Sequence, residues 1–402
     1  MIYLDHAATC AMRTAAREEM CRALEESYGN ASPSYPVAQK ARAGLDQART
    51  TLAGTIGADW REIFFTSGGT ESDNWALIGT ADLLSPGSHI ITGSVEHHAI
   101  LNTCAYLEGK GYTVSYLPVD GQGYVSPQVL RKELKRYPDT GLVSVMMANN
   151  EVGTIEPIRE LVKTTRDVNP EILFHSDAVQ AYGKLRINVA ELDVDMLSVS
   201  GHKIGGPKGI GFLYLRKGVQ LGALIHGGGQ ESGRRAGTEN VPAAIGFAAA
   251  AKEAEACRKT ENARIQELYT LFRRELRREL AMGEPGGCIW NGPELTTSDP
   301  TASDPTASDP SVASRLASNI NISFPGYDQQ SLLMNLDLEG ICASGGSACT
   351  TGALEPSHVL LAMGKSRKEA AGALRFTLGA ENTEEEICET VQKLKEILRR
   401  MA

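Results

Sequence analysis

Apolar residues recur at helical spacing near the start of the chain and again at its end. Over residues 36–57 they lie three or four positions apart, on one face of a helix, at Val37, Ala41, Leu45, Ala48, Leu52 and Ile56. Near the end, the capping-box pattern Thr383-x-x-Glu386 precedes a second stripe, formed by Ile387, Val391, Leu394 and Leu398. We therefore expect an amphipathic helix in the first sixth of the chain and another that closes it.

Between these helices, short apolar runs alternate with helical segments. The runs are rich in β-branched and aromatic residues and show little polar alternation, as strands covered on both faces do. They are Ile63–Phe65, His89–Thr92, Val143–Met147, Ile172–His175, Met196–Val199 and Gly211–Leu215. Strand–helix–strand order predicts a mainly parallel sheet in a large α/β domain. A long, charged helical segment over residues 243–282 then leads into a second unit.

A pentapeptide repeat separates the long helical segment from the last quarter of the chain. It reads TSDP-TASDP-TASDP and occupies residues 297–310. Proline every five residues, together with Ser, Thr and Asp, cannot form a core, so we expect a flexible surface loop over residues 296–312. A docking tail for another protein is the alternative interpretation.

Composition narrows the class of protein. The chain has 402 residues, enough for two or three domains, and its net charge of −9 argues against nucleic acid or an anionic membrane as a partner. The longest apolar stretch, Val241–Ala251, is about half of the roughly 20 residues that a membrane-spanning helix needs. The opening MIYLDHAATC lacks the pattern of a secretory signal, so we expect a cytoplasmic protein.

The cysteines and histidines do not have the spacing of a metal site. The eight cysteines are scattered without a Cys-x-x-Cys pair, which removes the usual zinc and dithiol motifs. His97 and His98 are adjacent, but no carboxylate stands at the helical spacing of a zinc motif, so we expect no metal. One of these histidines could instead stack on a ring or move protons near neutral pH.

Two polar residues end predicted strands and suggest a cofactor. Lys203 follows an apolar strand and precedes a turn rich in Gly and Pro. Burial there would lower the pKa of its amine, and an uncharged amine can form a Schiff base, although a surface lysine in a β-hairpin is the alternative. Asp177 ends a buried strand at the edge where α/β sheets bind ligands. Such a carboxylate pairs with the ring nitrogen of pyridoxal phosphate (PLP), which favours the first interpretation of Lys203.

Two loops of small residues complete the candidate chemistry. Residues 66–72, Thr-Ser-Gly-Gly-Thr-Glu-Ser, follow a strand and open a helix, so their backbone N–H groups could bind a phosphate. Cys349 lies in a second such loop, Ala-Ser-Gly-Gly-Ser-Ala-Cys-Thr-Thr-Gly over residues 343–352. Because bulky neighbours are missing there, we expect an exposed, mobile thiol that can reach a substrate.

Taken together, these motifs resemble the NifS/IscS group of cysteine desulfurases, which are PLP enzymes of the class-V aminotransferase type. The resemblance runs nearly end to end. It includes Tyr3-Leu-Asp-His-Ala-Ala-Thr9, Glu96-His97, Asn149-Asn-Glu-Val-Gly153, Asp177-Ala-Val-Gln180, Ser200-Gly-His-Lys203, Gly227-Gly-Gly-Gln-Glu231, Arg235-Ala-Gly-Thr238, Ser344-Gly-Gly-Ser-Ala-Cys349 and Leu354-Glu-Pro-Ser-His358. It implies a type-I PLP-dependent transferase fold. The large domain, with a mainly parallel seven-stranded sheet, would span residues 15–260, and a smaller α+β domain would combine residues 1–14 and 261–402, with a nucleophile loop at 342–354.

The resemblance also implies a role for each motif residue. Lys203 would carry PLP, Asp177 and Gln180 would contact its ring nitrogen and phenolic oxygen, and His97 would stack on the ring and move protons. Gly69, Thr70, Ser200 and His202 match the phosphate-binding positions. Thr238 matches the one that the partner subunit of a homodimer donates. Asn150, which also contacts the cofactor, and Arg375 match the groups that orient the substrate. Cys349 would be the nucleophile.

The implied reaction converts L-cysteine to L-alanine and leaves the sulfur as a persulfide on Cys349. A sulfur-acceptor protein, such as an iron–sulfur scaffold, would then receive it. Departures from the family pattern, such as Cys10-Ala11 in place of Thr-Pro and the repeat itself, leave the catalytic residue types intact. The alternatives are a selenocysteine lyase, another class-V aminotransferase and, least favoured, a scaffold that has lost its chemistry.

Overall fold

A seven-stranded sheet forms the centre of the computed structural model, which describes residues 1–283, 287–295, 314–345 and 356–401. In spatial order its strands are β2 (Ile63–Thr66), β8 (Gly211–Leu215), β7 (Met196–Ser200), β6 (Leu173–Asp177), β5 (Thr140–Ser144), β3 (His89–Gly93) and β4 (Thr113–Leu117). The strands from β7 to β4 are parallel, whereas β8 is antiparallel to both of its neighbours. The predicted α/β fold with a mainly parallel, seven-stranded sheet is confirmed.

The strands differ in how well their sequences predict them. Strands β3, β7 and β8 are buried at every position, which explains their continuous apolar runs. Strand β5 begins three residues before the predicted start, and its ladder continues irregularly to Met147, whose N–H donates to the Asp177 carbonyl. Strand β4 was not predicted, because it lies at the edge of the sheet and exposes Thr113 and Tyr116 to solvent.

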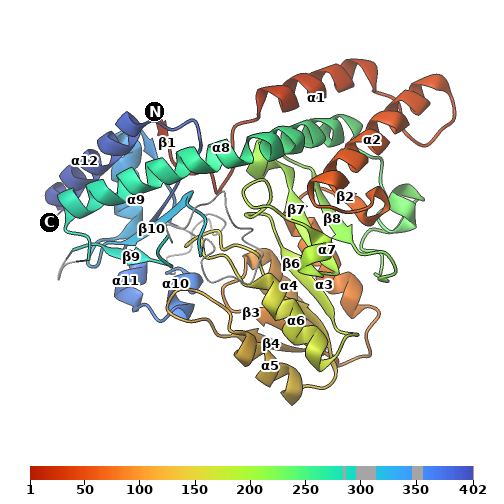
Figure 1. Cartoon of the computed structure of the whole chain (residues 1–402), viewed down its shortest axis with the longest axis horizontal. Coiled ribbons are helices and arrows are strands. Elements are labelled where there is room, and N and C mark those ends of the chain that lie inside the picture. The colour runs from red at the N-terminus through yellow and green to blue at the C-terminus, as the bar shows by residue number, and fades with distance from the viewer. Residues whose placement is uncertain (284–286, 296–313, 346–355, 402) are drawn as a thin grey trace.

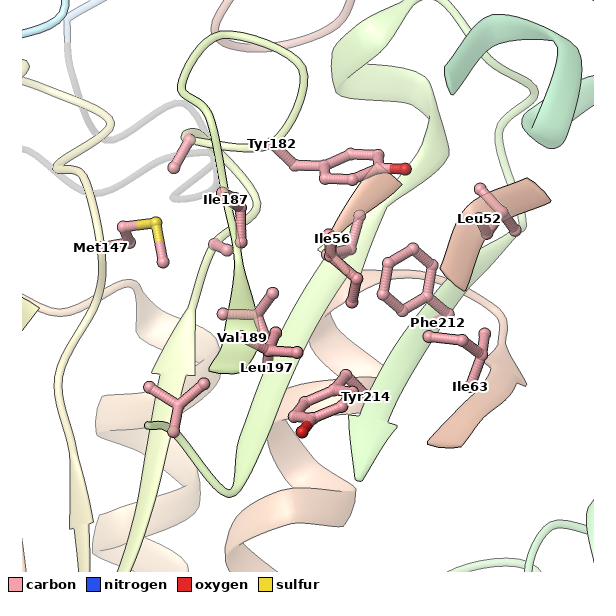
Figure 2. Close-up of a cluster of buried hydrophobic side chains, with 14 of the residues drawn as sticks. Leu52, Ile56, Ile63, Met147, Tyr182, Ile187, Val189, Leu197, Phe212 and Tyr214 are labelled. Atoms are coloured by element: carbon pink, nitrogen blue, oxygen red, sulfur yellow. The ribbon is translucent and has the colours of Figure 1, made fainter. Parts of the chain in front are cut away.

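Helices cover both faces of this sheet. One core holds apolar side chains of α2 (Pro36–Thr55), α5 (Pro127–Arg136) and α6 (Ile158–Val168) together with one face of the strands. Figure 2 shows part of this core, which includes Ile56, Leu197 and Phe212 together with Tyr182 and Tyr214. A second core joins the other face to α3 (Gly69–Ala81) and α4 (His98–Gly109). Burial on both faces leaves the carboxyl edge of the sheet as the place for polar chemistry.

A single long helix, α8 (Val241–Leu280), connects this sheet to the rest of the molecule. Figure 1 shows it running from the large sheet to the small one. Its first part packs against α1 (Thr14–Glu26) and α2, and its second part packs against α12 (Glu384–Met401). The predicted long helical segment is therefore one helix, and the predicted domain boundary at residue 260 falls inside it.

The last third of the chain builds two smaller sheets around a core of their own. Strands β12 (Ala373–Thr377), β10 (Asn319–Ser323) and β9 (Ile289–Asn291) form an antiparallel sheet. Strand β1 (Ile2–Tyr3) pairs in parallel with β11 (Ile341–Cys342), which brings the N-terminus into this part of the molecule (Figure 1). The helices here are α9 (Gln329–Leu338), α10 (His358–Ala362), α11 (Arg367–Ala371) and α12.

The predicted closing helix is confirmed as α12. Its capping box is formed, because the Glu386 N–H donates to Thr383 Oγ1 at 3.2 Å and the Thr383 N–H donates to Glu386 Oε2 at 3.1 Å. The predicted repeat loop and most of the predicted nucleophile loop, Cys349 included, lie outside the described residues. Among the described helices, none combines the length and the apolar content needed to cross a membrane.

Candidate active site

A cavity of about 330 Å³ opens at the carboxyl edge of the large sheet. It collects side chains from strand ends, from the N-termini of α3 and α4, and from the small sheet. Ten predicted site residues line it: Gly69, Thr70, His97, Asn150, Asp177, Gln180, Ser200, His202, Lys203 and Arg375. The fold thus brings together residues that lie up to 306 positions apart in the sequence, from Gly69 to Arg375.

Lys203 lies on a short 3-10 helix, Gly201–Ile204, that follows strand β7 directly. Its Nζ donates to the carbonyl oxygens of Ala7 at 2.5 Å and Ala8 at 2.9 Å. These carbonyls belong to the N-terminal segment, which passes over the carboxyl edge of the sheet on its way to α1. The predicted placement of Lys203 at a strand end is therefore confirmed, and two carbonyl groups hold its amine at the cavity wall.

Asp177 ends strand β6 and points its carboxylate into the same cavity. Its Oδ1 accepts the Val179 N–H at 2.8 Å. Burial raises the pKa of Asp177 to about 6, while the Val179 N–H and the positive charge of Lys203 oppose this rise. Asp177 is consequently ionised near neutral pH and provides a buried negative charge beside the amine.

A second carboxyl group, Asp73 on α3, lies behind this charge and was not predicted as a site residue. It is 1% exposed, and its Oδ1 has no hydrogen-bond partner among the described residues. Burial, and next the charge of Asp177, hold the pKa of Asp73 well above its usual range. Asp73 therefore keeps its proton, since two adjacent carboxyl groups in a buried site do not both ionise.

Three strands supply the polar groups that surround these two acids. His175 on β6 lies between Ser144 of β5 and Ser198 of β7, with both Nδ1–Oγ and Nε2–Oγ distances at 2.9 Å. Burial lowers the pKa of His175 to about 3, so the ring is neutral. This neutral hydrogen-bonded chain crosses three strands, and its His175 Nε2 lies 3.7 Å from Asp73 Oδ1. It adds no charge that would compete with Asp177.

Gln180 is held from two sides. Its Nε2 donates to the Ala7 carbonyl at 3.0 Å, and its Oε1 accepts from Lys184 Nζ at 3.2 Å. These two contacts fix which end of the amide is the donor and which is the acceptor. Lys184 has no predicted role, and only its position four residues after Gln180 in the sequence could have suggested this contact.

The end of the cavity at the N-terminus of helix α3 is suited to an anion. Gly69 and Thr70 begin helix α3, whose first N–H groups and dipole favour a negative ligand. A Cβ atom on Gly69 would lie 2.5 Å from Val179 Cγ2, so only glycine fits there. Ser200 and His202 face this end as well, and His202 Nδ1 lies 3.1 Å from Thr9 Oγ1. Burial lowers the pKa of His202 to about 4.

His97 is the N-cap residue of helix α4. Its Nδ1 accepts the Ala99 N–H at 3.1 Å, so the proton of the neutral ring resides on Nε2. Burial, with a smaller contribution from the charge of Lys203, lowers the pKa of His97 to about 4. The ring is thus a neutral, rigidly oriented wall of the cavity.

Arg375 lies on β12, in the small sheet, and is 2% exposed. Its Nη2 forms an ion pair with Asp5 Oδ1 at 2.8 Å, and its Nη1 donates to the Asn150 carbonyl at 3.1 Å. Asn150 belongs to a loop from the large sheet, so these contacts join the two sheets at the cavity. Asp5 was not predicted as a site residue, because its proximity to Arg375 depends on β1 and β12 coming together.

Three further residues, Glu151, His98 and His358, complete this wall of the cavity. No role was predicted for Glu151 or His358, and His98 was only the alternative to His97 as a histidine that moves protons. Glu151 is 1% exposed and accepts the hydroxyl of Ser357 at its Oε2, at 2.5 Å. His358 begins α10, and its ring centroid lies 4.7 Å from that of His98. His98 and His358 both line the cavity, although 260 positions separate them in the sequence.

Two predicted site residues are not found in this cavity. Thr238 is exposed and does not line it. Cys349 lies outside the described residues, but the chain is described on both sides of its segment. On one side the Ser344 N–H donates to the Arg375 carbonyl at 3.1 Å, and on the other side Ser357 contacts Glu151. Both flanks of residues 346–355 therefore contact residues that line the cavity.

Comparison with known proteins places the whole chain within one group. Residues 2–281 and 301–389 match the aminotransferase class-V family. A cysteine desulfurase IscS from Dictyoglomus turgidum is 44% identical over 401 residues, which cover 100% of this chain and 95% of the relative. A solved structure of a NifS-like protein is 36% identical with a TM-score of 0.87 and covers 99% of both chains. A structure of SspA in complex with cysteine is 32% identical with a TM-score of 0.78, over 95% of this chain and 100% of that one.

Proposed function

The chain belongs to the class-V aminotransferase family, and we propose that it acts in that family as a PLP-dependent cysteine desulfurase. It would convert L-cysteine to L-alanine and retain the sulfur on an enzyme thiol. The observation that carries this proposal is the cavity, which combines an amine, a buried carboxylate, a neutral imidazole and an arginine from two sheets. Each group matches a need of the reaction.

The residues of the cavity fit PLP. When bound, PLP supplies an electron sink that makes the α-proton of an amino acid acidic. Lys203 would hold the cofactor covalently, Asp177 would pair with its ring nitrogen, and Gln180 would contact its phenolic oxygen. Asp177 is suited to pair with the ring nitrogen because it is ionised, while the neighbouring Asp73 keeps its proton. His97 forms a flat neutral surface against which the ring would stack.

The phosphate group of PLP would lie at the anion end of the cavity. Gly69 and Thr70 offer the N-terminus of α3, and Ser200 and His202 add side-chain donors. We also propose that a second copy of the chain completes this end through Thr238. The exposure of Thr238, which does not line its own cavity, supports a role in a neighbouring site.

The substrate would bind between Arg375 and Lys203. Arg375 can bind the α-carboxylate, and its ion pair with Asp5 and its bond to the Asn150 carbonyl orient it for that contact. Asn150 adds a polar group beside it. The amine of Lys203 is then placed to move the α-proton of the substrate, because carbonyl groups hold it at the same wall.

The sulfur would leave the substrate by attack of a thiolate. The Cys349 sulfur forms a bond to the substrate sulfur while the substrate carbon–sulfur bond breaks, which leaves a persulfide and alanine. The flanks of the segment that holds Cys349 support this role, because they contact Arg375 and Glu151 at the cavity. We propose that the persulfide then passes to an acceptor protein in the cytoplasm, such as an iron–sulfur scaffold.

A substrate comparison tests this function. The purified, PLP-loaded protein is given cysteine, selenocysteine, or alanine with an oxo acid, and the products are quantified. We expect equal amounts of alanine and sulfide from cysteine in the presence of a reductant, and neither product from the Lys203→Ala variant. Turnover of selenocysteine alone, or transamination without sulfide, would overturn the assignment.

A further inference from the structure

We propose that His98 and His358 act together as the site that holds the proton exchanged during sulfur transfer. This inference rests on the proposed function and adds two residues to it. Both imidazoles line the cavity, and they come from the N-termini of two helices, α4 and α10, that belong to different parts of the chain. His98 is one of the two adjacent histidines that the sequence offers as a possible proton carrier, and His358 has no predicted role.

The proposed reaction requires such a site because it moves one proton. The enzyme thiol loses this proton before its sulfur attacks, and the sulfur–sulfur bond forms with the electron pair of the resulting thiolate. As the carbon–sulfur bond breaks, its electron pair stays with the carbon, and the methyl group of alanine gains one proton. No oxidant or reductant is consumed in this exchange. A base near the thiol must hold the proton between the two events.

His97 is poorly suited to this task. Its Nδ1 lone pair accepts the Ala99 N–H at 3.1 Å as the helix N-cap, and its Nε2 already carries the ring proton. Taking up a second proton at Nδ1 would break the cap and place a positive charge near Lys203. His97 can therefore donate a hydrogen bond from Nε2, but another group must accept the proton.

His358 has the opposite arrangement. Its Nε2 lies 3.0 Å from the Glu96 carbonyl oxygen, and because a carbonyl only accepts, Nε2 carries the hydrogen. The lone pair therefore lies on Nδ1, which has no hydrogen-bond partner among the described residues. By accepting the hydrogen on Nε2, the Glu96 carbonyl fixes the tautomer and leaves Nδ1 to accept a proton.

His98 extends this base into a pair. Its ring centroid lies 4.7 Å from that of His358 at an interplanar angle of 48°, and 6.5 Å from that of His97. The pKa of His98 is lowered by burial and by His358, and the pKa of His358 is lowered by burial. Both rings are thus neutral near pH 7, and because each repels a charge on the other, the pair holds a single proton.

The position of the pair in the cavity matches its proposed role. The charged and titratable groups around it are His97 on α4, Glu151 on the adjoining loop, and Lys203 and Arg375 across the cavity. The charge of Glu151 favours a proton on His98. His358 is also close in sequence to the segment that holds Cys349. The described chain resumes at Pro356 after that segment, two residues before His358.

The test is single-turnover formation of alanine from cysteine, measured across pH in the PLP-loaded protein with His98→Gln and His358→Gln variants. We expect each variant to lose about a hundredfold or more in rate, the usual contribution of a positioned acid or base. Cysteine binding, followed by the absorbance of the bound cofactor, should stay unchanged. The double variant should lose little more than either single variant, because residues that act as a unit are not additive. His226→Gln, an exposed histidine outside the cavity, is the matched control.

The pH profile separates this role from a structural one. Wild-type turnover should fall at acidic pH as the pair becomes protonated, below the usual histidine range. The His358→Gln variant should lose this part of the fall and keep the part that comes from protonation of Asp177, whose pKa is about 6. Wild-type rates and profiles in both variants, or weakened cysteine binding with an unchanged chemical rate, would overturn the inference. A wild-type protein that makes no alanine would instead overturn the proposed function, so the two failures are distinguishable.

Discussion

At the scale of single residues, this protein buries several carboxyl groups and keeps only some of them charged. Burial holds the pKa of Asp73 and Glu96 well above the usual range and raises that of Glu156 to about 8. Asp177 rises only to about 6, because the Val179 N–H and Lys203 stabilise its anion. A backbone N–H opposes the rise at Glu96 and Glu156 as well, so the difference follows from the positive charge of Lys203, which acts on Asp177. It leaves a charged carboxylate where the cofactor would need one.

The effect of burial on Glu156 can be tested by measuring how the stability of the protein depends on pH. It is 4% exposed, its Oε2 accepts the Val125 N–H at 2.9 Å, and its Oε1 has no partner among the described residues. The pKa of Glu156 is higher in the folded protein than in the unfolded chain. Its contribution to the free energy of unfolding is therefore fully present below about pH 4.5 and is lost as the pH rises towards 8. Each pKa unit corresponds to about 1.4 kcal/mol, so the effect should be measurable.

We therefore expect Glu156→Gln to abolish this loss. Urea unfolding is measured between pH 5 and pH 9, a range that includes the pKa of about 8. The free energy of unfolding of the variant should rise relative to that of the wild type as the pH increases. Glu160→Gln, at an exposed position on the following helix, should retain the wild-type slope. Parallel curves for wild type and Glu156→Gln would mean that Glu156 is ionised in the folded protein.

At the scale of elements, the cavity depends on how helix N-termini and strand ends are fixed. Helix α10 begins with Ser357 as its N-cap, and Ser357 also donates to Glu151 at 2.5 Å. Because Glu151 is buried, this contact attaches α10, and with it the flank of the segment that holds Cys349, to the loop of Asn150. The helix start thus serves the site as well as the fold.

Ser357→Ala should slow sulfur transfer without preventing substrate binding. We expect a loss of about 1–3 kcal/mol in stability, from the lost cap and from a buried carboxyl left without its partner. Persulfide formation should fall, while the affinity for cysteine should stay near that of the wild type. Ser366→Ala, which removes the N-cap of the neighbouring helix α11 but has no contact with Glu151, is the control. Equal effects of both variants on persulfide formation would contradict this account.

The elements also explain what the sequence could and could not predict. Strands buried on both faces were predicted because their apolar runs are continuous, whereas the half-exposed edge strand β4 lacks that signal. Most of the ten site residues in the cavity follow strand ends or begin helices, whereas Arg375 lies within β12 and was predicted from the family resemblance alone. Asp73 and His358 carry no such signal, because their roles depend on contacts with residues distant in the sequence. The adjacent pair His97-His98 indicates a functional histidine but not what each ring contacts.

At the scale of the whole molecule, the site lies where two sheets meet. Helix α8 spans both cores, and Arg375 from the small sheet contacts Asn150 from the large one (Figure 1). Arg315, which is 1% exposed, strengthens this junction by donating to the carbonyls of Val152 and Asn319. A substrate bound between Arg375 and Lys203 would therefore contact both the small sheet and the large sheet.

Mixing two defective variants tests the proposed homodimer with shared sites. Thr238→Ala should weaken PLP retention, and Lys203→Ala should lose covalent attachment. In a mixed dimer, one site would combine an intact Lys203 with an intact Thr238, so some activity and tight PLP binding should return. Mixtures that behave as the sum of the separate variants, or a chain that is monomeric in solution, would contradict the shared site.

Transfer of the cysteine sulfur to Cys349 can be detected directly from the mass of the protein after one turnover. The PLP-loaded enzyme is mixed with cysteine without reductant, and its peptides are then analysed for an added sulfur atom. We expect one added sulfur on the peptide that contains Cys349, absent in Cys349→Ala and retained in Cys21→Ala, an exposed cysteine on α1. Alanine formed without added sulfur on Cys349, or added sulfur on another cysteine, would contradict the account.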